Sequence, residues 1–128
     1  MKATEIVLEL MVKDVQETIQ FYSEILEFEL EAKEEDNGKL YWAKLSNHGF
    51  SISLKEEGRL KSEEEFMKEY KVGGSFSLCF QVDDLEHQYE RVKVKCELFN
   101  HPHLTPCGAT QFSMKDNNGY VINFERFN

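Results

Sequence analysis

The chain has 128 residues, of which 41% are hydrophobic and 30% charged, a balance typical of a small globular domain. Its net charge of −9 argues against binding to nucleic acids or to anionic membrane surfaces, which need clustered Lys and Arg. No apolar run approaches the roughly 20 residues of a membrane span, and we find no export signal. We therefore expect a cytoplasmic protein with reduced thiols at Cys79, Cys96 and Cys107, which lack CxxC spacing.

The first half of the chain predicts one strand, one helix and three further strands. Residues 5–12 alternate in polarity, which predicts a half-buried strand with one apolar face at Ile6, Leu8, Leu10 and Val12. Asp14, with Glu17 three residues later, is a helix N-cap signal. The expected helix carries an apolar stripe at Val15, Ile19, Tyr22 and Leu26. Strands are then expected over 28–33, 40–45 and 50–55, separated by turns rich in Asn and Gly.

A linker over residues 58–74 follows these strands. Ser62 and Glu65 have the spacing of a capping box, which predicts a short surface helix beginning near Ser62. Phe66, Met67 and Tyr70 would give this helix a small apolar face, and Gly73 and Gly74 would end it.

The second half repeats the pattern of the first. Leu8 matches Leu78 and Asp14 matches Asp84, which is a constant offset of 70 residues that continues to Ile52 and Ile122. The repeat predicts a strand over 76–82, a helix capped by Asp83 or Asp84, and strands over 97–101, 109–115 and 120–127. The helix stripe lies at Leu85, Tyr89 and Val92. Each half is therefore expected to form a βαβββ unit.

Several segments of this repeat match the motifs of a known family. The first half contains Leu8-x-Leu10-x-Val12-x-Asp14, followed by Phe21-Tyr22-x-x-x-Leu26-x-Phe28. The second half contains Phe80-x-Val82-Asp83-Asp84-Leu85 and the closing run KDNNGYVI at 115–122. These segments resemble the vicinal oxygen chelate superfamily, also called the glyoxalase/bleomycin resistance protein/dioxygenase fold, with Glu27 where that family usually has Gly.

The resemblance implies an α+β fold of two tandem βαβββ modules that form half-barrel cups within a single domain of residues 1–128. Module one would span about 4–57, the linker helix about 58–74, and module two about 75–128. Family members often pair as homodimers and enclose a cavity for a small molecule. Enzymes of the family hold a divalent metal in the cup through His, Glu or Gln side chains, and the metal acts as a Lewis acid.

The family's four metal-ligand positions can be placed by motif register. They fall on Val7, Ser53, Ser77 and Asn123. Valine has no donor atom, and neutral hydroxyl and amide groups are weak ligands for Zn²⁺, Ni²⁺ or Fe²⁺. We therefore expect no metal and no other cofactor at these positions, which argues against glyoxalase and extradiol dioxygenase activities for this chain.

Two other groups of residues could hold a metal. Glu9, Cys79 and Glu125 lie two residues beyond the family positions and so share their strand faces, with Lys55 as a competing cation. This set more often forms a polar cavity wall with a Glu–Lys ion pair. His101 and His103 form an H-x-H pair, but Pro102 between them favours an edge strand or a loop with ordinary surface histidines.

The resulting functional hypothesis is a metal-independent binding protein for a drug or metabolite, with no catalytic residues assigned. The alternative is an enzyme of the same superfamily, lyase-like or dioxygenase-like, with a displaced metal site. Trp42 and Phe112 are repeat-equivalent aromatics that would either stack on a planar ligand or belong to the helix-facing core. The acids Glu9 and Glu125 favour a cationic or polar aromatic ligand. The predicted ligand-binding residues are Val7, Glu9, Met11, Trp42, Ser51, Ser53, Ser77, Cys79, Gln81, Phe112, Asn123 and Glu125.

Overall fold

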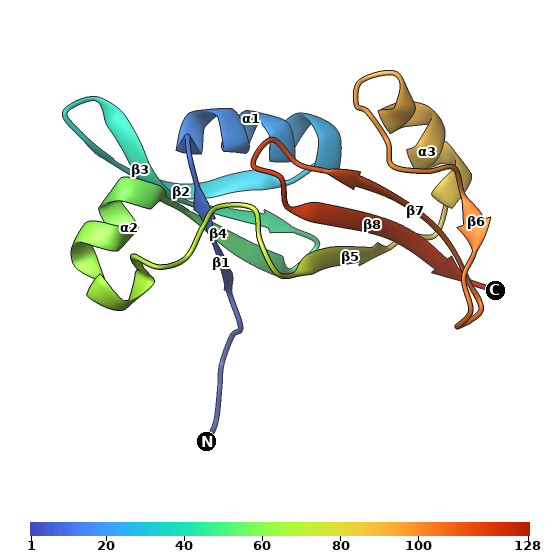
Figure 1. The fold of residues 1–128 in the computed structure, drawn as a ribbon, viewed down its shortest axis with the longest axis horizontal. Coiled ribbons are helices and arrows are strands. Elements are labelled where there is room, and N and C mark those ends of the chain that lie inside the picture. The colour runs from blue at the N-terminus through green and yellow to red at the C-terminus, as the bar shows by residue number, and fades with distance from the viewer. The chain divides into compact units, whose positions relative to one another are not determined.

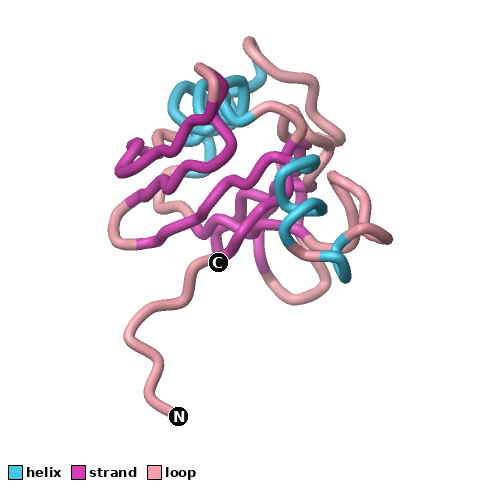
Figure 2. The backbone as a smooth tube through the Cα atoms, turned by 90° about the vertical axis from the view of Figure 1, so that its left-hand side faces the viewer, coloured by secondary structure: helices cyan, strands magenta, loops and turns pink.

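The computed structural model describes residues 1–128, and the chain divides into two compact units, Met1–Val72 and Gly73–Asn128. Each unit has the order strand, helix and three strands. The first contains β1 (Leu8–Val12), α1 (Val15–Leu26), β2 (Glu29–Asp36), β3 (Lys39–Asn47) and β4 (Phe50–Glu56), followed by α2 (Glu57–Glu63) and the 3₁₀ turn η1 (Glu65–Met67). The second contains β5 (Ser77–Gln81), α3 (Leu85–Lys93), β6 (His103–Leu104), β7 (Ala109–Lys115) and β8 (Val121–Phe127). The predicted pair of βαβββ modules, each with a mixed four-stranded sheet, is confirmed (Figures 1 and 2).

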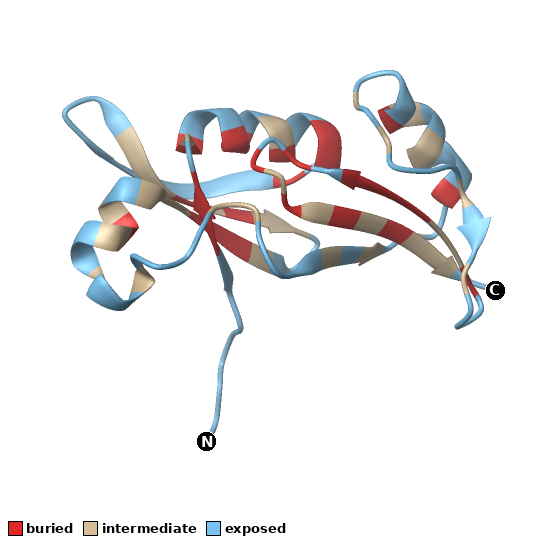
Figure 3. Ribbon diagram, in the orientation of Figure 1, coloured by how far each residue is buried: buried red, intermediate tan, exposed pale blue.

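The sheet of the first unit has the strand order β1-β4-β3-β2. β1 runs parallel to β4, whereas the other neighbours are antiparallel. α1 packs against β2, β3 and β4. Side chains that alternate along the strands share the face covered by α1 and are fully buried, and Figure 3 colours the buried residues red. They include Leu10, Val12, Ala43, Leu45 and Leu54.

The N-terminal cap of α1 forms as the sequence predicts. The Asp14 carboxylate accepts the backbone N–H of Glu17 at 2.9 Å, which satisfies one of the free amides of the first turn. The predicted stripe is also confirmed, because Val15, Ile19, Tyr22 and Leu26 are all buried. None of the helices is both long and apolar enough to cross a membrane.

The C-terminal cap of α1 contains a local strain. Glu27 lies in the left-handed region at φ 58° and ψ 34°, and its N–H bonds to the carbonyl of Tyr22. This position usually carries Gly, because a Cβ raises the energy of the left-handed conformation.

Replacing Glu27 with Gly should therefore stabilise the protein by about 0.5–1 kcal/mol. Chemical denaturation followed by circular dichroism measures this change. Glu27→Ala is the matched control, because it removes the same carboxylate but keeps the strained Cβ. Equal stabilities of the two variants would contradict the assignment of strain.

The second unit has the corresponding strand order β5-β8-β7-β6, with β5 parallel to β8. Asp84 caps α3 by accepting the N–H of His87 at 3.0 Å, which settles the choice between Asp83 and Asp84. An aromatic cluster forms the core beneath α3. Phe112 stacks on Phe124 with ring centroids 4.9 Å apart and meets Tyr89 of α3 edge-on at 5.3 Å.

The linker helix differs from its prediction in position and in its cap. α2 begins directly after β4, and Ser62 lies inside the helix instead of capping it. The carboxylate of Glu56 accepts the backbone N–H groups of Gly58 (2.7 Å) and Arg59 (3.0 Å), so the strand supplies the cap. Leu60 is the buried apolar residue of this helix, whereas Phe66 remains 70% exposed. A capping-box pattern predicts a helix only where an apolar face can be buried.

Several strand boundaries also differ from the predictions, and β2 and β3 are longer than expected. β1 begins at Leu8, so Ile6 precedes the strand and is 87% exposed. β5 begins at Ser77 instead of residue 76. The strand expected over 97–101 is absent as such, since only a bridge from Leu98 to Met114 forms there and β6 begins at His103. The Asn100 side chain accepts the N–H of Ser113 at 2.8 Å and replaces a strand carbonyl, while Pro102 lacks a donor for a ladder.

Candidate ligand-binding faces

The side of the first sheet opposite α1 carries most of the residues predicted for the first module. We call it the first open face, and it is defined by the strand positions that alternate with the buried core. Its members are Glu9, Met11, Trp42, Lys44, Ser46, Ser51, Ser53 and Lys55. Val7 immediately precedes β1 and is 39% exposed. Met11 and Ser53 lie on this face but are buried, so they shape its floor.

The strand register arranges this face in rows. Trp42 on β3 lies opposite Lys55 on β4, and Lys55 lies beside Met11 on β1. In the next row Lys44 lies opposite Ser53, and Ser53 lies beside Glu9. Trp42 therefore lies on the open face and not in the helix-facing core, the two positions that the sequence left open for it.

Both lysines of the first open face are paired with carboxylates from outside the sheet. Lys44 Nζ lies 3.2 Å from Glu5 Oε1, in the segment before β1. Lys55 Nζ lies 2.6 Å from Glu63 Oε1, at the end of α2. The expected Glu–Lys ion pair thus involves Glu63 and not Glu9. Each ammonium group lowers the pKa of its partner carboxyl, chiefly through the hydrogen bond that it donates.

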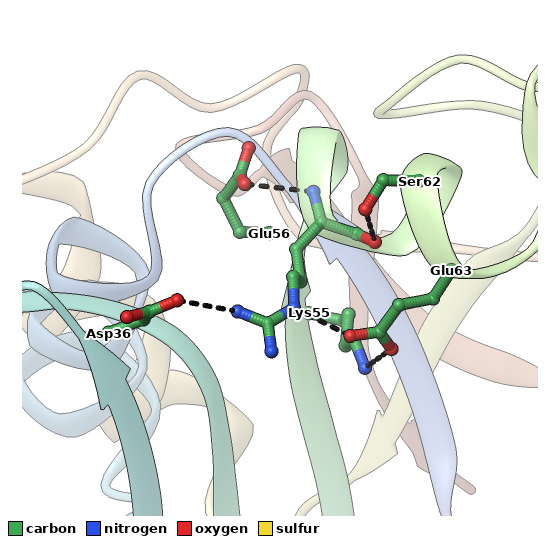
Figure 4. Close-up of polar contacts among 6 residues, drawn as sticks. Asp36, Lys55, Glu56, Ser62 and Glu63 are labelled. Atoms are coloured by element: carbon green, nitrogen blue, oxygen red, sulfur yellow. Dashed lines mark hydrogen bonds and ion pairs between the residues drawn. The ribbon is translucent and has the colours of Figure 1, made fainter.

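A charged cluster attaches α2 to the strands (Figure 4). Arg59 donates from Nε to Glu63 at 2.6 Å and from Nη1 to Asp36 at 3.4 Å. Its guanidinium also lies 3.8 Å from the centroid of the Tyr41 ring. A shallow pocket of about 280 Å³ lies beside this cluster and contains none of the predicted ligand-binding residues. The charged groups of the cluster are paired with one another, so we interpret the cluster as an anchor for α2.

The second unit has a corresponding open face, opposite α3. It is lined by Ser77, Cys79, Gln81, Gln111, Ser113, Asn123 and Glu125. Ser113 Oγ donates to Asn123 Oδ1 at 2.6 Å, and Asn123 Nδ2 donates to Cys79 Sγ at 3.4 Å. Glu125 accepts a hydrogen bond from Gln111 Nε2 at 3.2 Å. This face therefore presents hydroxyl, amide and thiol groups that are already partly oriented by one another.

Phe112 does not line the second open face. It is fully buried and contacts Tyr89 of α3, so it belongs to the helix-facing core. Its assignment as a ligand-binding residue was based on an offset of 70 residues from Trp42. Ser53 of β4 and Asn123 of β8 are equivalent residues, 70 positions apart. Their strand partners are Lys44 and Ser113, which are 69 positions apart, so β7 corresponds to β3 at an offset of 69. A slip of one residue moves a side chain to the other face of the sheet.

The candidate metal ligands can be located within each unit. Ser53 lies on the first open face, and Ser77 and Asn123 lie on the second. Within either unit, no three His, Cys, Asp or Glu side chains form a group that could hold a metal. His101 Nδ1 bonds to the Tyr89 hydroxyl at 2.8 Å, whereas His103 Nδ1 bonds to the carbonyl of His101 at 2.8 Å. These two rings are thus oriented by separate partners.

The sequence interpretation missed Lys44, Ser46, Gln111 and Ser113 on the open faces. All four lie on β3 or β7, the third strand of each module. Their alternation was visible, but the sequence did not indicate which alternate set faces the helix. In β3 the buried side chains are those of Ala43 and Leu45, and the larger Trp42 lies on the open side.

Comparisons with known proteins agree with this fold. Residues 6–124 match the sequence profile of the Glyoxalase/Bleomycin resistance protein/Dioxygenase superfamily. None of the curated proteins matches the chain.

Three solved structures illustrate the similarity. A glyoxalase/bleomycin resistance protein/dioxygenase from Nocardioides has a TM-score of 0.80 and 16% identity, over 99% of this chain and 85% of that chain. TioX from Micromonospora sp. ML1 has a TM-score of 0.76 and 18% identity, over 98% and 100%. TnmS3 from Streptomyces sp. CB03234, described as an antibiotic binding protein, has a TM-score of 0.75 and 20% identity, over 100% and 99%.

Proposed function

The chain belongs to the glyoxalase/bleomycin resistance protein/dioxygenase superfamily, and we propose that it is a small-molecule binding protein that works without a resident metal. The open faces of its sheets are the binding surfaces. The observation that carries this proposal is the chemistry of the first open face, where an aromatic ring, two ammonium groups and several hydroxyls lie on one surface.

The residues at the family's metal positions support the metal-independent part of the proposal. Val7 has no donor, and Ser53, Ser77 and Asn123 offer only neutral oxygen or nitrogen atoms. Asn123 is further engaged with Ser113 and Cys79. Neutral groups of this kind suit hydrogen bonds to an organic ligand better than coordination of a transition metal.

Trp42 supports the ligand-binding part. It is half-buried, and its face of the sheet also carries Lys44 and Lys55. A tryptophan of this kind offers a large apolar surface for a planar ligand, and neighbouring polar groups fix the ligand's orientation. TnmS3, whose description is an antibiotic binding protein, shares the fold and gives the class of ligand some support.

Thermal denaturation of chelator-treated protein against a panel of planar aromatic antibiotics tests this proposal. At least one compound should raise the Tm, because a ligand at about 100 times its Kd stabilises the native state by roughly 2.7 kcal/mol. Trp42→Ala should abolish the increase and Trp42→Phe should retain part of it. Phe50→Ala, at the 77% exposed first residue of β4, is the control that should leave it unchanged.

Two results would contradict the proposal. The first is stabilisation that appears only after a divalent metal is restored. The second is stabilisation that survives in a folded Trp42→Ala variant.

A homodimer in the cytoplasm remains a prediction. The dimer is supported by the edge strand β1, which carries no Lys or Pro and is preceded by the exposed Ile6 and Val7. By contrast, the opposite edge strand β2 contains five acidic residues, a composition that discourages association of edges.

A further inference from the structure

We propose that the ligand of the first open face is a planar molecule with an anionic group, which Lys44 and Lys55 bind while its ring lies on Trp42. This inference rests on the proposed function and names the class of ligand. The charge of this ligand is opposite to the positive charge that Glu9 and Glu125 favour in the sequence.

The positions of the two lysines carry the inference. Lys44 lies two residues after Trp42 on β3, and Lys55 lies directly opposite Trp42 on β4. All three side chains are therefore neighbours on one face of the sheet. The lysine side chains are only 26% and 16% exposed, so their charges are partly removed from water and attract an anion more strongly than surface lysines do.

Both lysines already have a carboxylate partner, and the partner of Lys44 is one that a ligand can replace. Glu5 comes from a segment without regular secondary structure before β1, and its side chain is 49% exposed. Glu63 ends α2 and is 41% exposed. Glu5 makes a single ion pair, to Lys44, so exchanging Glu5 for a ligand carboxylate costs little. Glu63 also bonds Arg59 in the α2 anchor and stays in place beside Lys55. We interpret Glu5 as an internal substitute for the anionic group.

The other acids near this face do not cancel the attraction. Glu9, on β1, is separated from Lys44 by Ser53 of β4, and this row lies next to the row of Trp42 and Lys55. Glu34, on β2, lies opposite Trp42 and is exposed to solvent. Water and salt screen both carboxylates more strongly than the half-buried lysines.

The single tryptophan of the chain provides the measurement, because its fluorescence reports on this face alone. The probes are para-nitrobenzoate, para-nitrobenzamide and para-nitrobenzylammonium, which share a quenching ring and differ in charge. We expect saturable quenching with the anion bound about tenfold more tightly than the neutral amide, and the cation more weakly than either.

Variants of the charged groups give effects of opposite sign. Lys44→Met and Lys55→Met should each weaken para-nitrobenzoate about tenfold and leave para-nitrobenzamide unchanged. Glu5→Gln should tighten para-nitrobenzoate several-fold, because it removes the carboxylate that competes for Lys44. Lys61→Met is the matched control with no expected effect, since Lys61 pairs with Glu57 along α2.

Tighter binding of para-nitrobenzylammonium, weakened by Glu9→Gln, would overturn the inference while leaving small-molecule binding at this face intact. Absence of saturable quenching by any probe would overturn it as well. Failure of the proposed function is detected separately, by the antibiotic panel in thermal denaturation.

Discussion

Replacing Phe112 with Ala is expected to lower the free energy of unfolding by about 3–5 kcal/mol, the range for truncating a buried Phe. Phe112 is fully buried, stacks on Phe124 at 4.9 Å and meets Tyr89 at 5.3 Å. Removal of its ring leaves a cavity between β7 and α3 and breaks both aromatic contacts. Guanidinium denaturation followed by circular dichroism measures the loss.

Phe127→Ala is the matched control for this experiment. Phe127 lies on β8 of the same unit but is 52% exposed, so the same substitution should cost about 1 kcal/mol or less. Similar costs for the two variants would mean that Phe112 is not core. In that case the sequence-based assignment of Phe112 to the ligand-binding face would regain its support.

Gly73→Ala should lower the free energy of unfolding by about 2–4 kcal/mol, through backbone strain and steric overlap together. Gly73 opens the second unit at φ 89°, a conformation that Ala adopts only at a cost. A Cβ at this position would also overlap the backbone carbonyl oxygen of Asn118. The turn before β8 would have to move, because a backbone atom cannot rotate away as a side chain can.

Gly108→Ala separates these two contributions. Gly108 lies in the same unit with the same φ of 89°, but a Cβ there would meet nothing within 4 Å. Its replacement should therefore cost only the conformational part, about 1–2 kcal/mol. Equal losses for the two variants, in the same denaturation experiment, would rule out the contact between Gly73 and the Asn118 carbonyl.

Local chemistry explains why much of the fold could be predicted. Asp14 and Asp84 are side chains whose capping role depends only on the backbone amides three residues later. The stripe from Val15 to Leu26 reports burial directly, since any amphipathic helix of this period must cover its apolar side. Both signals are contained within a few residues of sequence.

The position of α2 could not be predicted in this way. Ser62 offered a local cap, yet the helix begins at Glu57, where Leu60 can be buried. Lys55 and Asp36 then hold it through Glu63 and Arg59. These partners lie on other elements, so their contribution is not visible in the sequence of the helix itself.

The candidate site was predicted in part for a similar reason. Alternation placed Glu9, Ser53 and Asn123 on the open faces, because β1, β4 and β8 have a clear apolar side. The third strands contain large residues on both sides, so only the repeat offset of 70 residues aligns Trp42 with Phe112 in the sequence. The turn between β7 and β8 breaks that alignment by one residue, and only the pairing register reveals it.

The central claim is that the first open face binds a small molecule without a metal, and nuclear magnetic resonance of chelator-treated protein tests it most directly. Titration with para-nitrobenzoate should shift the indole N–H of Trp42 and the amides of β3 and β4 around Lys44 and Lys55. Shifts confined to the pocket beside Arg59 or to the α1 side of the sheet would contradict the claim, as would shifts that require an added divalent metal.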